Sequence, residues 1–194
     1  MNKNLAVNKS DSELDKIKTL RGMTGAGLMN CKEALKLKNG DLDQAVQYLK
    51  EKGLAIANKK SSRLAKEGRI ESYIHHNSRI GVLVEINCET DFVAQTDELK
   101  AFAKEVALQI AASDSLRFVN REDLSDEQLN SLKVDLGPAE SEKVINEKLK
   151  ECFLLEQISI KHSSQTIKDR LQQTIAKLGE NIKIARFIRY ELGQ

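Results

Sequence analysis

The stretch "IGVLVEINC" (residues 80–88) places an apolar residue at every second position. This alternation predicts a β-strand with one buried face, because successive side chains of a strand point to opposite faces of a sheet. The preceding segment "RIESYIHH" (69–76) carries Ile70 and Ile74 and is separated from the strand by the turn-forming residues "NSR". The two segments are therefore expected to pair as a β-hairpin.

Downstream of the hairpin, the apolar spacing changes to that of helices. Thr96 is a suitable N-cap for a helix whose apolar residues are Leu99, Phe102, Ala103, Val106 and Ile110. More helices are expected up to about residue 178, and "ENIKIARFIRYEL" (180–192) is expected to return as a strand. We expect this strand to be apolar on both faces, with Ile182, Ile184 and Ile188 on one and Ala185 and Phe187 on the other. A hairpin, several helices and a returning strand predict an α+β core of antiparallel strands and helices.

Upstream of the hairpin, residues 10–53 show the pattern of three short helices. Asp41 is expected to cap the third helix, with Gln44 at the boxed position, and Gly53 is expected to end it. The polar stretch "ANKKSSRLAKEG" (57–68) is typical of a linker. We therefore expect three parts: a three-helix module at 1–53, a linker at 54–68 and a core domain at 69–194.

The glycine-rich segment "GMTGAG" (22–27) lies between the first two expected helices. A phosphate-binding loop would need a buried strand before it and a Gly-Lys-Ser/Thr ending. A helix precedes this segment and Leu28 and Met29 follow it, so we expect the glycines to allow a sharp turn between helices.

The composition is that of a soluble globular protein, with 40% hydrophobic and 31% charged residues in a chain of 194. The formal net charge is only +2 and no block of the sequence gathers positive charge, so a nucleic-acid partner is not expected. No apolar run is long enough to span a bilayer, so a membrane segment is not expected. The stretch "MNKNLAVNKSDSEL" also lacks the features of a signal or transit peptide.

The residue types that bind metals or transfer protons are scattered along the chain. The cysteines form no C-x-x-C pair, which argues against a disulfide framework or a zinc site; we expect reduced core residues at Cys31, Cys88 and Cys152. The histidines have no Cys or carboxylate at ligand spacing, and we expect surface or strand-end positions for His75, His76 and His162. Neither a nucleophile elbow nor a tuned acid–base pair is present. We therefore expect no metal, no cofactor, no catalytic residue and no enzymatic activity.

Phe92 stands in "NCETDFVAQTDEL" (87–99), past the alternating strand and before the capped helix. Its ring could be the first core residue of that helix, or it could project between acidic neighbours and insert into a partner protein. Leu28 and Met29, after the glycine turn, could likewise either pack into this chain's core or project toward a partner. We expect Leu28 to pack inward and Met29 to be able to project.

Three stretches of the chain, in matching order, resemble the translation elongation factor Ts family. They are "LRGMTGAGLMNCKEAL" (20–35), "EINCETDFVAQ" (85–95) and "ENIKIARFIRYELG" (180–193). The resemblance runs from about residue 12 to the end of the sequence. Three independent matches make it specific.

The resemblance implies a guanine-nucleotide exchange factor that binds elongation factor Tu, both GDP-bound and nucleotide-free, and promotes GDP release during translation elongation. It implies that the three-helix module is ubiquitin-associated-like. It also implies that Phe92 enters between helices of the partner's GTPase domain, with Asp91 as its polar neighbour, and disturbs the magnesium and phosphate contacts that retain GDP. Thr90 and Val93 flank this pair in the same T-D-F-V segment. A second set of partner contacts is implied at Arg21, Leu28 and Met29.

Some positions depart from the family pattern. Asn30 and Gln95 stand where members commonly have Asp and a basic residue, respectively. The chain is expected to be a short form, without the duplicated core and C-terminal helix of long members. Resemblance to short members implies a homodimer formed through the core. The bacterial cytoplasm, plastid stroma and mitochondrial matrix all remain open as its location.

Two other functions are compatible with parts of the sequence. The N-terminal helices alone would suit a ubiquitin-associated-like protein-binding adaptor without exchange activity. Such an adaptor leaves the T-D-F-V segment and the last strand unexplained. A small cytosolic enzyme is disfavoured by the missing catalytic constellation.

Overall fold

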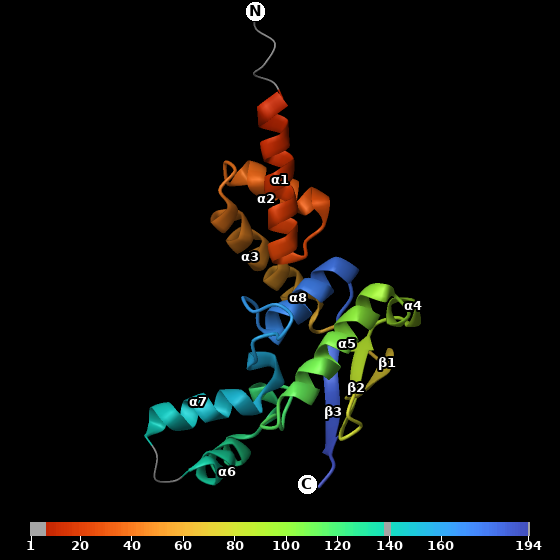
Figure 1. The fold of residues 1–194 in the computed structure, drawn as a ribbon, viewed down its shortest axis with the longest axis vertical. Helices are drawn as coiled ribbons and strands as arrows, with labels where there is room; N and C mark the ends of the chain where they lie inside the picture. Colours follow the sequence, from red (N-terminus) through yellow and green to blue (C-terminus); the bar gives the residue numbers. More distant parts are fainter. Residues whose placement is uncertain (1–6, 138–140, 194) are drawn as a thin grey trace, which may run out of the picture.

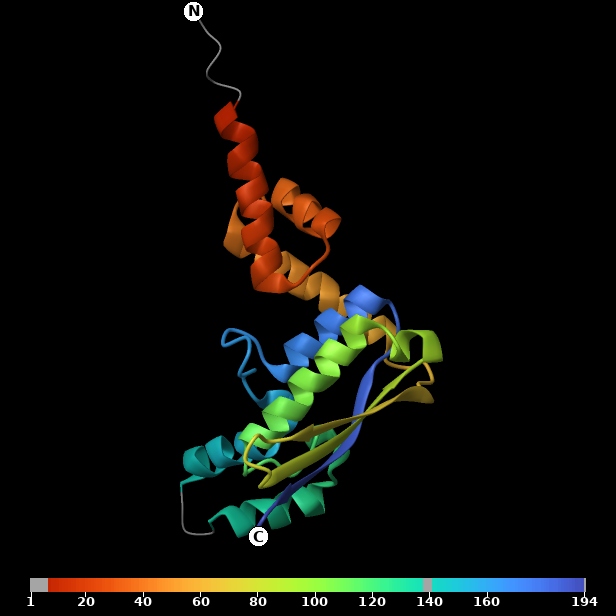
Figure 2. The same cartoon turned by 45° about the vertical axis from the view of Figure 1, so that its right-hand side comes forward.

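The computed structural model describes residues 7–137 and 141–193, with side chains from residue 13 onward. A three-helix module lies at one end, a sheet covered by helices on one face follows it, and a pair of helices projects beside the far end of the sheet (Figures 1 and 2). The α+β class predicted from the sequence is confirmed. No helix among the described residues is long and apolar enough to cross a membrane.

The N-terminal module consists of α1 (Val7–Thr24), α2 (Leu28–Leu37) and α3 (Leu42–Lys60). Its apolar stripes meet in one cluster that contains Ile17, Leu20, Cys31, Ala34, Leu35, Ala45 and Leu49. Asp41 caps α3 as predicted, because its Oδ1 accepts the backbone N–H of Gln44 at 2.9 Å and its Oδ2 accepts the Gln44 side-chain amide at 3.0 Å. The three predicted helices of this part are therefore present.

The predicted end of α3 at Gly53 is wrong, because the helix continues to Lys60. A glycine inside a helix costs only about 1 kcal/mol relative to alanine. The following turn carries Ile56, which is partly buried, and Ala57, which is buried in the cluster of the central part. Tertiary packing of this last stretch of α3 against α8 thus outweighs the preference of glycine.

The central part is a three-stranded antiparallel sheet in the order β1-β2-β3. The hairpin and the returning strand are both confirmed. The elements of this part are β1 (Glu67–Ile74), β2 (Ile80–Cys88), α4 (Asp91–Ala94), α5 (Asp97–Ala112), α8 (Ile167–Leu178) and β3 (Lys183–Glu191). Thr96 caps α5 as predicted, with its side chain accepting from the backbone N–H of Leu99.

The inner face of the sheet packs against α5. The alternating residues of β2 supply one half of this core and the helical stripe of α5 the other; the buried members are Val82, Val84, Ile86, Cys88, Leu99, Phe102, Ala103, Val106 and Ile110. Helix α8 joins α5 through a buried ion pair, in which the Arg170 Nε and Nη2 each donate to the Glu105 carboxylate at 3.0 Å. The Ser159 hydroxyl donates to the same carboxylate at 2.9 Å, so the charge of Glu105 is fully engaged.

The predicted faces of the last strand are partly wrong. Ile86 of β2 pairs with Ile184 of β3, whereas the adjacent Glu85 pairs with Arg186, so Ala185 is the extra residue of a β-bulge. The bulge shifts the alternation by one position. Ile184 and Phe187 therefore share the inner face, while the side chains that follow at alternate positions, Ile188 and Tyr190, lie on the other face.

This other face of the sheet, which we call the outer face, carries exposed apolar side chains from all three strands. They are Ile70, Ile74, Leu83, Ile188 and Tyr190. Figure 2 shows α5 and α8 on the opposite side of the sheet, and among the described helices none covers the outer face.

The projecting pair consists of α6 (Asp126–Leu136) and α7 (Glu142–Cys152), flanked by the short 3-10 turns η1 (Arg121–Asp123) and η2 (Leu154–Glu156). It has a small core of its own, formed by Leu132, Leu149, Cys152 and Phe153. Ser125 and Gln128 form a capping box at the start of α6. The three described parts thus have three separate hydrophobic clusters.

Candidate protein-binding site

Phe92 lies on α4, a single helical turn between the end of β2 and the start of α5. Thr90 is the N-cap of this turn, and its side chain accepts from the backbone N–H of Val93 at 3.4 Å. On the inward side, Ala94 is buried and Val93 packs against the central core. The turn is therefore anchored on one side and free on the other.

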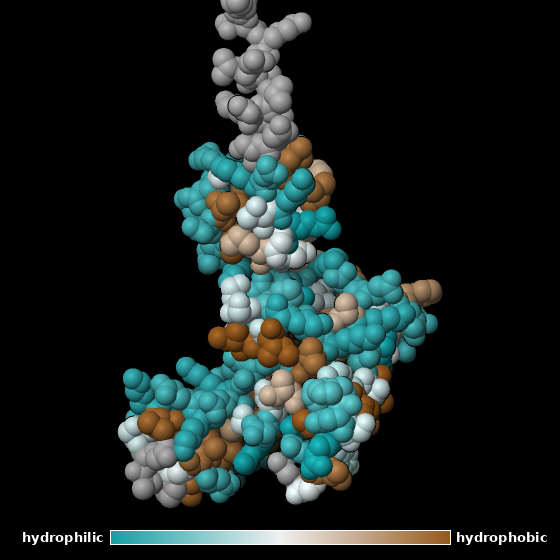
Figure 3. Space-filling model, viewed as in Figure 1, coloured by the Kyte–Doolittle hydropathy of each residue, from teal (hydrophilic) through white to brown (hydrophobic). Residues whose placement is uncertain are grey.

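The free side of the turn carries the phenylalanine. Phe92 exposes 82% of its surface, so its ring takes no part in the core of this chain. Asp91 is exposed beside it. Helix α4 forms a corner of the molecule in Figure 1, and apolar surface projects at that corner in Figure 3. Exposing a ring on a capped turn gives up its burial energy within the chain, which is the arrangement expected of an anchor for a partner.

The glycine turn positions a second group of exposed side chains. Gly25 has φ of +66°, a left-handed conformation that favours glycine, and its N–H donates to the Arg21 carbonyl at 2.8 Å. Helix α2 then begins at Leu28, which is 54% exposed, next to Met29, which is 74% exposed. The expectation that Leu28 packs inward is wrong, because the buried face of α2 begins only at Cys31.

The structure places the two groups on separate parts of the molecule. In both views α2 lies on the module and α4 at the corner of the central part, with the end of α3 and α8 between them (Figures 1 and 2). Arg21, Leu28 and Met29 are all exposed on the first part, and Asp91 and Phe92 are exposed on the second. The predicted site residues thus lie in two separate regions rather than in one patch.

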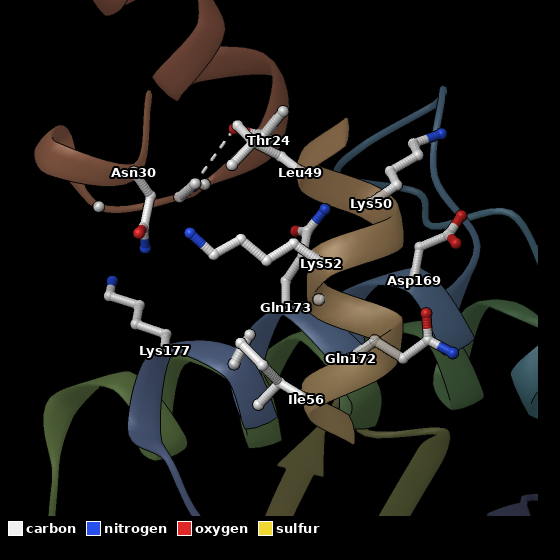
Figure 4. A pocket seen from close by; sticks show the side chains of 15 residues that line it. Thr24, Asn30, Leu49, Lys50, Lys52, Ile56, Asp169, Gln172, Gln173 and Lys177 are labelled. Carbon is white, nitrogen blue, oxygen red and sulfur yellow. Dashed lines mark hydrogen bonds between the residues drawn. The ribbon is translucent and has the colours of Figure 1, made fainter. Parts of the chain in front are cut away.

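A pocket of about 120 Å³ lies at the seam between the module and α8 (Figure 4). The glycine turn, Lys50, Lys52 and Lys177 line it. Lys52 is paired with Glu33 at 3.0 Å, and Lys177 is paired with Glu98. Much of the positive charge at this pocket is therefore neutralised within the chain.

The cysteines and histidines also occupy the environments that the sequence indicates for core and surface residues. All three thiols are buried, and burial raises the pKa of Cys31, Cys88 and Cys152. His75 lies at the end of β1, where its Nδ1 contacts the Tyr73 hydroxyl at 3.0 Å. The described residues contain no group of three or more His, Cys, Asp or Glu that could hold a metal ion.

Two residues that the sequence patterns did not indicate contact the Phe92 turn. Glu180 and Asn181 stand between the glycine that ends α8 and the first residue of β3. Glu180 accepts hydrogen bonds from Glu89 and Thr90, and Asn181 donates to Glu89. Both residues open the family-like stretch at 180–193, but the sequence patterns gave neither of them a role.

Together these features define an α+β protein that presents exposed apolar side chains on two turns, the form expected of a protein-binding factor. The family model for elongation factor TS matches residues 30–152. Elongation factor Ts of Carboxydothermus hydrogenoformans is 50% identical, with 92% of this chain and 88% of that protein covered. The chain belongs to the elongation factor Ts family.

Two further relatives, one of them named as chloroplastic, are similar to the same extent. Elongation factor Ts of Synechocystis is 48% identical over 92% of this chain and 88% of its own length. The protein named chloroplastic elongation factor Ts of Porphyra purpurea is 50% identical over 91% of this chain and 86% of its own length. The similarity therefore extends over the module and the core alike.

Proposed function

We propose that this protein is a guanine-nucleotide exchange factor for elongation factor Tu, acting during translation elongation. Membership of the elongation factor Ts family supports this role. The observation that carries the mechanism is the exposure of Phe92 on the anchored turn α4. In this mechanism Phe92 enters the partner's GTPase domain near the magnesium and phosphate contacts of GDP, with Asp91, Thr90 and Val93 around it.

The mechanism needs no catalytic residue, because it is a coupling between two binding equilibria. An exchange factor that binds the nucleotide-free partner more tightly than the GDP-bound one must weaken the binding of GDP to the same extent. The ratio of its two affinities equals the ratio by which GDP affinity falls. Burying one phenylalanine ring contributes about 2 to 3 kcal/mol, a useful share of such a coupling energy. The ring is already outside the core, so inserting it into a partner requires no unfolding of this chain.

The second contact region holds the partner while the ring acts. Arg21, Leu28 and Met29 supply a cation and two exposed apolar groups at the glycine turn. We assign residues 1–53 to a ubiquitin-associated-like module, 54–68 to a linker that begins inside α3, and 69–194 to the core. The module thus contributes affinity and the core contributes the exchange activity.

We further propose that the protein forms a homodimer through the outer face of the sheet. Its exposed apolar residues lie on a face that the described helices leave open, and a symmetric pair lets one such face cover its own copy. We also propose that the protein works in the bacterial cytoplasm, a plastid stroma or a mitochondrial matrix; its bacterial and chloroplastic relatives support the first two.

Release of fluorescently labelled GDP from elongation factor Tu tests the main proposal. The protein should accelerate release, and the rate should saturate with its concentration. Binding to elongation factor Tu without acceleration would identify an adaptor instead. The absence of both binding and acceleration would reject the family role for this chain.

A further inference from the structure

The backbone past the end of β2 is held by one carboxylate. The ladder between β1 and β2 ends at Cys88, so the N–H groups of Glu89 and Thr90 lie beyond the paired strands. The Glu180 Oε2 accepts both of these N–H groups at 3.1 Å. Backbone N–H groups that leave a sheet need a partner, and a carboxylate that accepts two of them at once fixes the direction of the chain.

The same carboxylate orients the cap of the Phe92 turn. The Thr90 hydroxyl donates to the Glu180 Oε1 at 2.7 Å. The proton of the Thr90 hydroxyl is thus engaged with Glu180, which leaves the lone pairs of its oxygen free to accept. The Val93 N–H donates to this oxygen at 3.4 Å. Glu180 therefore acts on the position of Phe92 through Thr90, without contacting the ring.

The next residue ties the same point to the end of the module's last helix. The Asn181 side chain is 2% exposed, and its Nδ2 donates to the carbonyls of Arg63 at 2.6 Å and Ser61 at 3.3 Å, just past the end of α3. Its backbone N–H donates to the Glu89 Oε1 at 2.6 Å. The Lys60 ammonium, in the last turn of α3, donates to the Gly179 carbonyl.

These contacts converge on two adjacent residues from two directions. Glu180 holds the segment that carries Phe92, and Asn181 holds the segment that leaves the module. Other contacts also attach the module to the core, such as the bond from the Gln165 side chain to the Met23 carbonyl at 2.6 Å. The Glu180–Asn181 pair bonds both to the Phe92 segment and to the chain leaving α3. Arg63 of that chain adds one direct contact, from its Nη1 to the Glu89 Oε2 at 3.4 Å.

We propose that Glu180 and Asn181 are positioning residues that form a joint between the two partner-binding regions, so that Phe92 and the Leu28–Met29 turn meet elongation factor Tu at a fixed relative geometry. This inference rests on the proposed exchange function. Two contact regions at a fixed spacing bind one partner as a single unit, since the second contact costs little additional entropy. A loosened joint leaves only a fraction of the molecules in the binding-competent geometry, and the apparent dissociation constant rises in inverse proportion to that fraction.

The joint therefore affects the two kinetic constants of GDP release differently. Glu180→Ala and Asn181→Ala should each raise KM, the factor concentration at half-maximal release, by about tenfold, because fewer molecules have the competent geometry. The maximal rate, kcat, should stay within about twofold, because saturation restores the bound geometry. Glu147→Ala, an exposed glutamate on α7, is the matched control and should change neither constant.

Amide hydrogen exchange of the full-length free protein gives a readout that does not depend on activity. Glu180→Ala should accelerate exchange at the Glu89 and Thr90 amides while the amides of β2 and α5 stay protected. Glu180→Gln keeps one acceptor oxygen and should show smaller effects of the same kind; it also serves if Glu180→Ala does not fold. Unchanged protection at Glu89 and Thr90 together with unchanged KM in these variants would overturn the joint.

A double-variant cycle tests whether the joint acts through the module. In a Met29→Ala background, Asn181→Ala should raise KM by a smaller factor than in the natural sequence, because less affinity is left to lose at the module. An equal factor in both backgrounds would overturn the proposal. If the natural protein itself fails to accelerate GDP release, the exchange function is wrong, and the amide measurement still decides whether Glu180 fixes the Phe92 turn.

Discussion

Phe92 and Phe102 lie on consecutive helices of one chain, yet 82% of the first and 2% of the second is exposed. Phe102 fills the core between α5 and the sheet, whereas Phe92 points away from it. The two residues are chemically identical and close in sequence. They therefore form a matched pair for separating stability from partner binding.

Phe92→Ala should reduce the maximal rate of GDP release from elongation factor Tu severalfold or more. Because the ring is outside the core, the thermal midpoint should hardly move. Phe102→Ala should instead cost about 3 to 5 kcal/mol of stability, as a buried aromatic does. Thermal unfolding and GDP release measured on both variants check this. A large fall in midpoint for Phe92→Ala, with normal release by the protein that remains folded, would contradict the proposed insertion.

Deleting residues 1–53 should leave a folded core that binds elongation factor Tu more weakly. The clusters of the module and the core are separate, and the deletion spares Ala57, which belongs to the core. Calorimetric titration against elongation factor Tu measures the loss. The double variant Leu28→Ala, Met29→Ala in the full chain is the control for a general effect of truncation. Equal affinity of the truncated and full chains would show that the module contributes nothing to holding the partner.

The protein should sediment as a dimer at micromolar concentration under reducing conditions. Leu83→Lys and Ile188→Lys place a charge at paired positions in the middle of the outer face and should each yield a monomer. Val134→Lys, at a more exposed apolar position on α6, should leave the dimer intact. A single monomeric species for the natural sequence would remove the dimer proposal.

The Glu89 carboxylate should contribute to the fall in the free energy of unfolding at acidic pH. The Asn181 N–H, followed by the nearby Arg63, lowers its pKa below the ordinary value of 4.5. A carboxyl group with a lowered pKa stabilises the fold above its ordinary pKa, and this contribution is lost as the pH falls through the lowered value. Glu89→Gln should therefore flatten the decline of the urea midpoint between about pH 5 and about pH 3. The urea midpoint of Glu147→Gln should decline with falling pH as steeply as that of the natural protein.

The three thiols should react slowly with a thiol reagent near neutral pH in the folded protein. Their pKa values are raised above 9.0 by burial, so little thiolate is present and little of it is accessible. All three should react rapidly in about 6 M guanidinium chloride. A thiol that reacts equally fast in both conditions would mean that its site opens in the native state.

Local periodicity was enough to predict most of the elements. The alternation around Val84 predicted β2, and the spacing around Phe102 predicted α5, because both patterns follow directly from which side chains the element buries. The caps at Asp41 and Thr96 were also readable, since they involve residues three positions apart. Such features need no knowledge of the rest of the chain.

The errors occurred where distant segments decide the outcome. Gly53 does not end α3, because packing of Ala57 into a core formed mostly by later residues extends the helix. Leu28 is exposed because the face of α2 that packs against α1 and α3 begins only at Cys31. Of the candidate site, the sequence indicated Phe92, but not Glu180, whose bonds to Thr90 join segments 90 residues apart.

The bulge at Ala185 has a consequence for shape. Without this residue, Ile184 would be followed directly by Arg186, and the inward and outward alternation of β3 would remain intact. Ala185 is therefore not needed to sort the side chains between the two faces. What a bulge adds is local bending and extra right-handed twist. A single exposed alanine thus bends β3 locally, and in the proposed dimer a facing copy of the chain would have to match that bend.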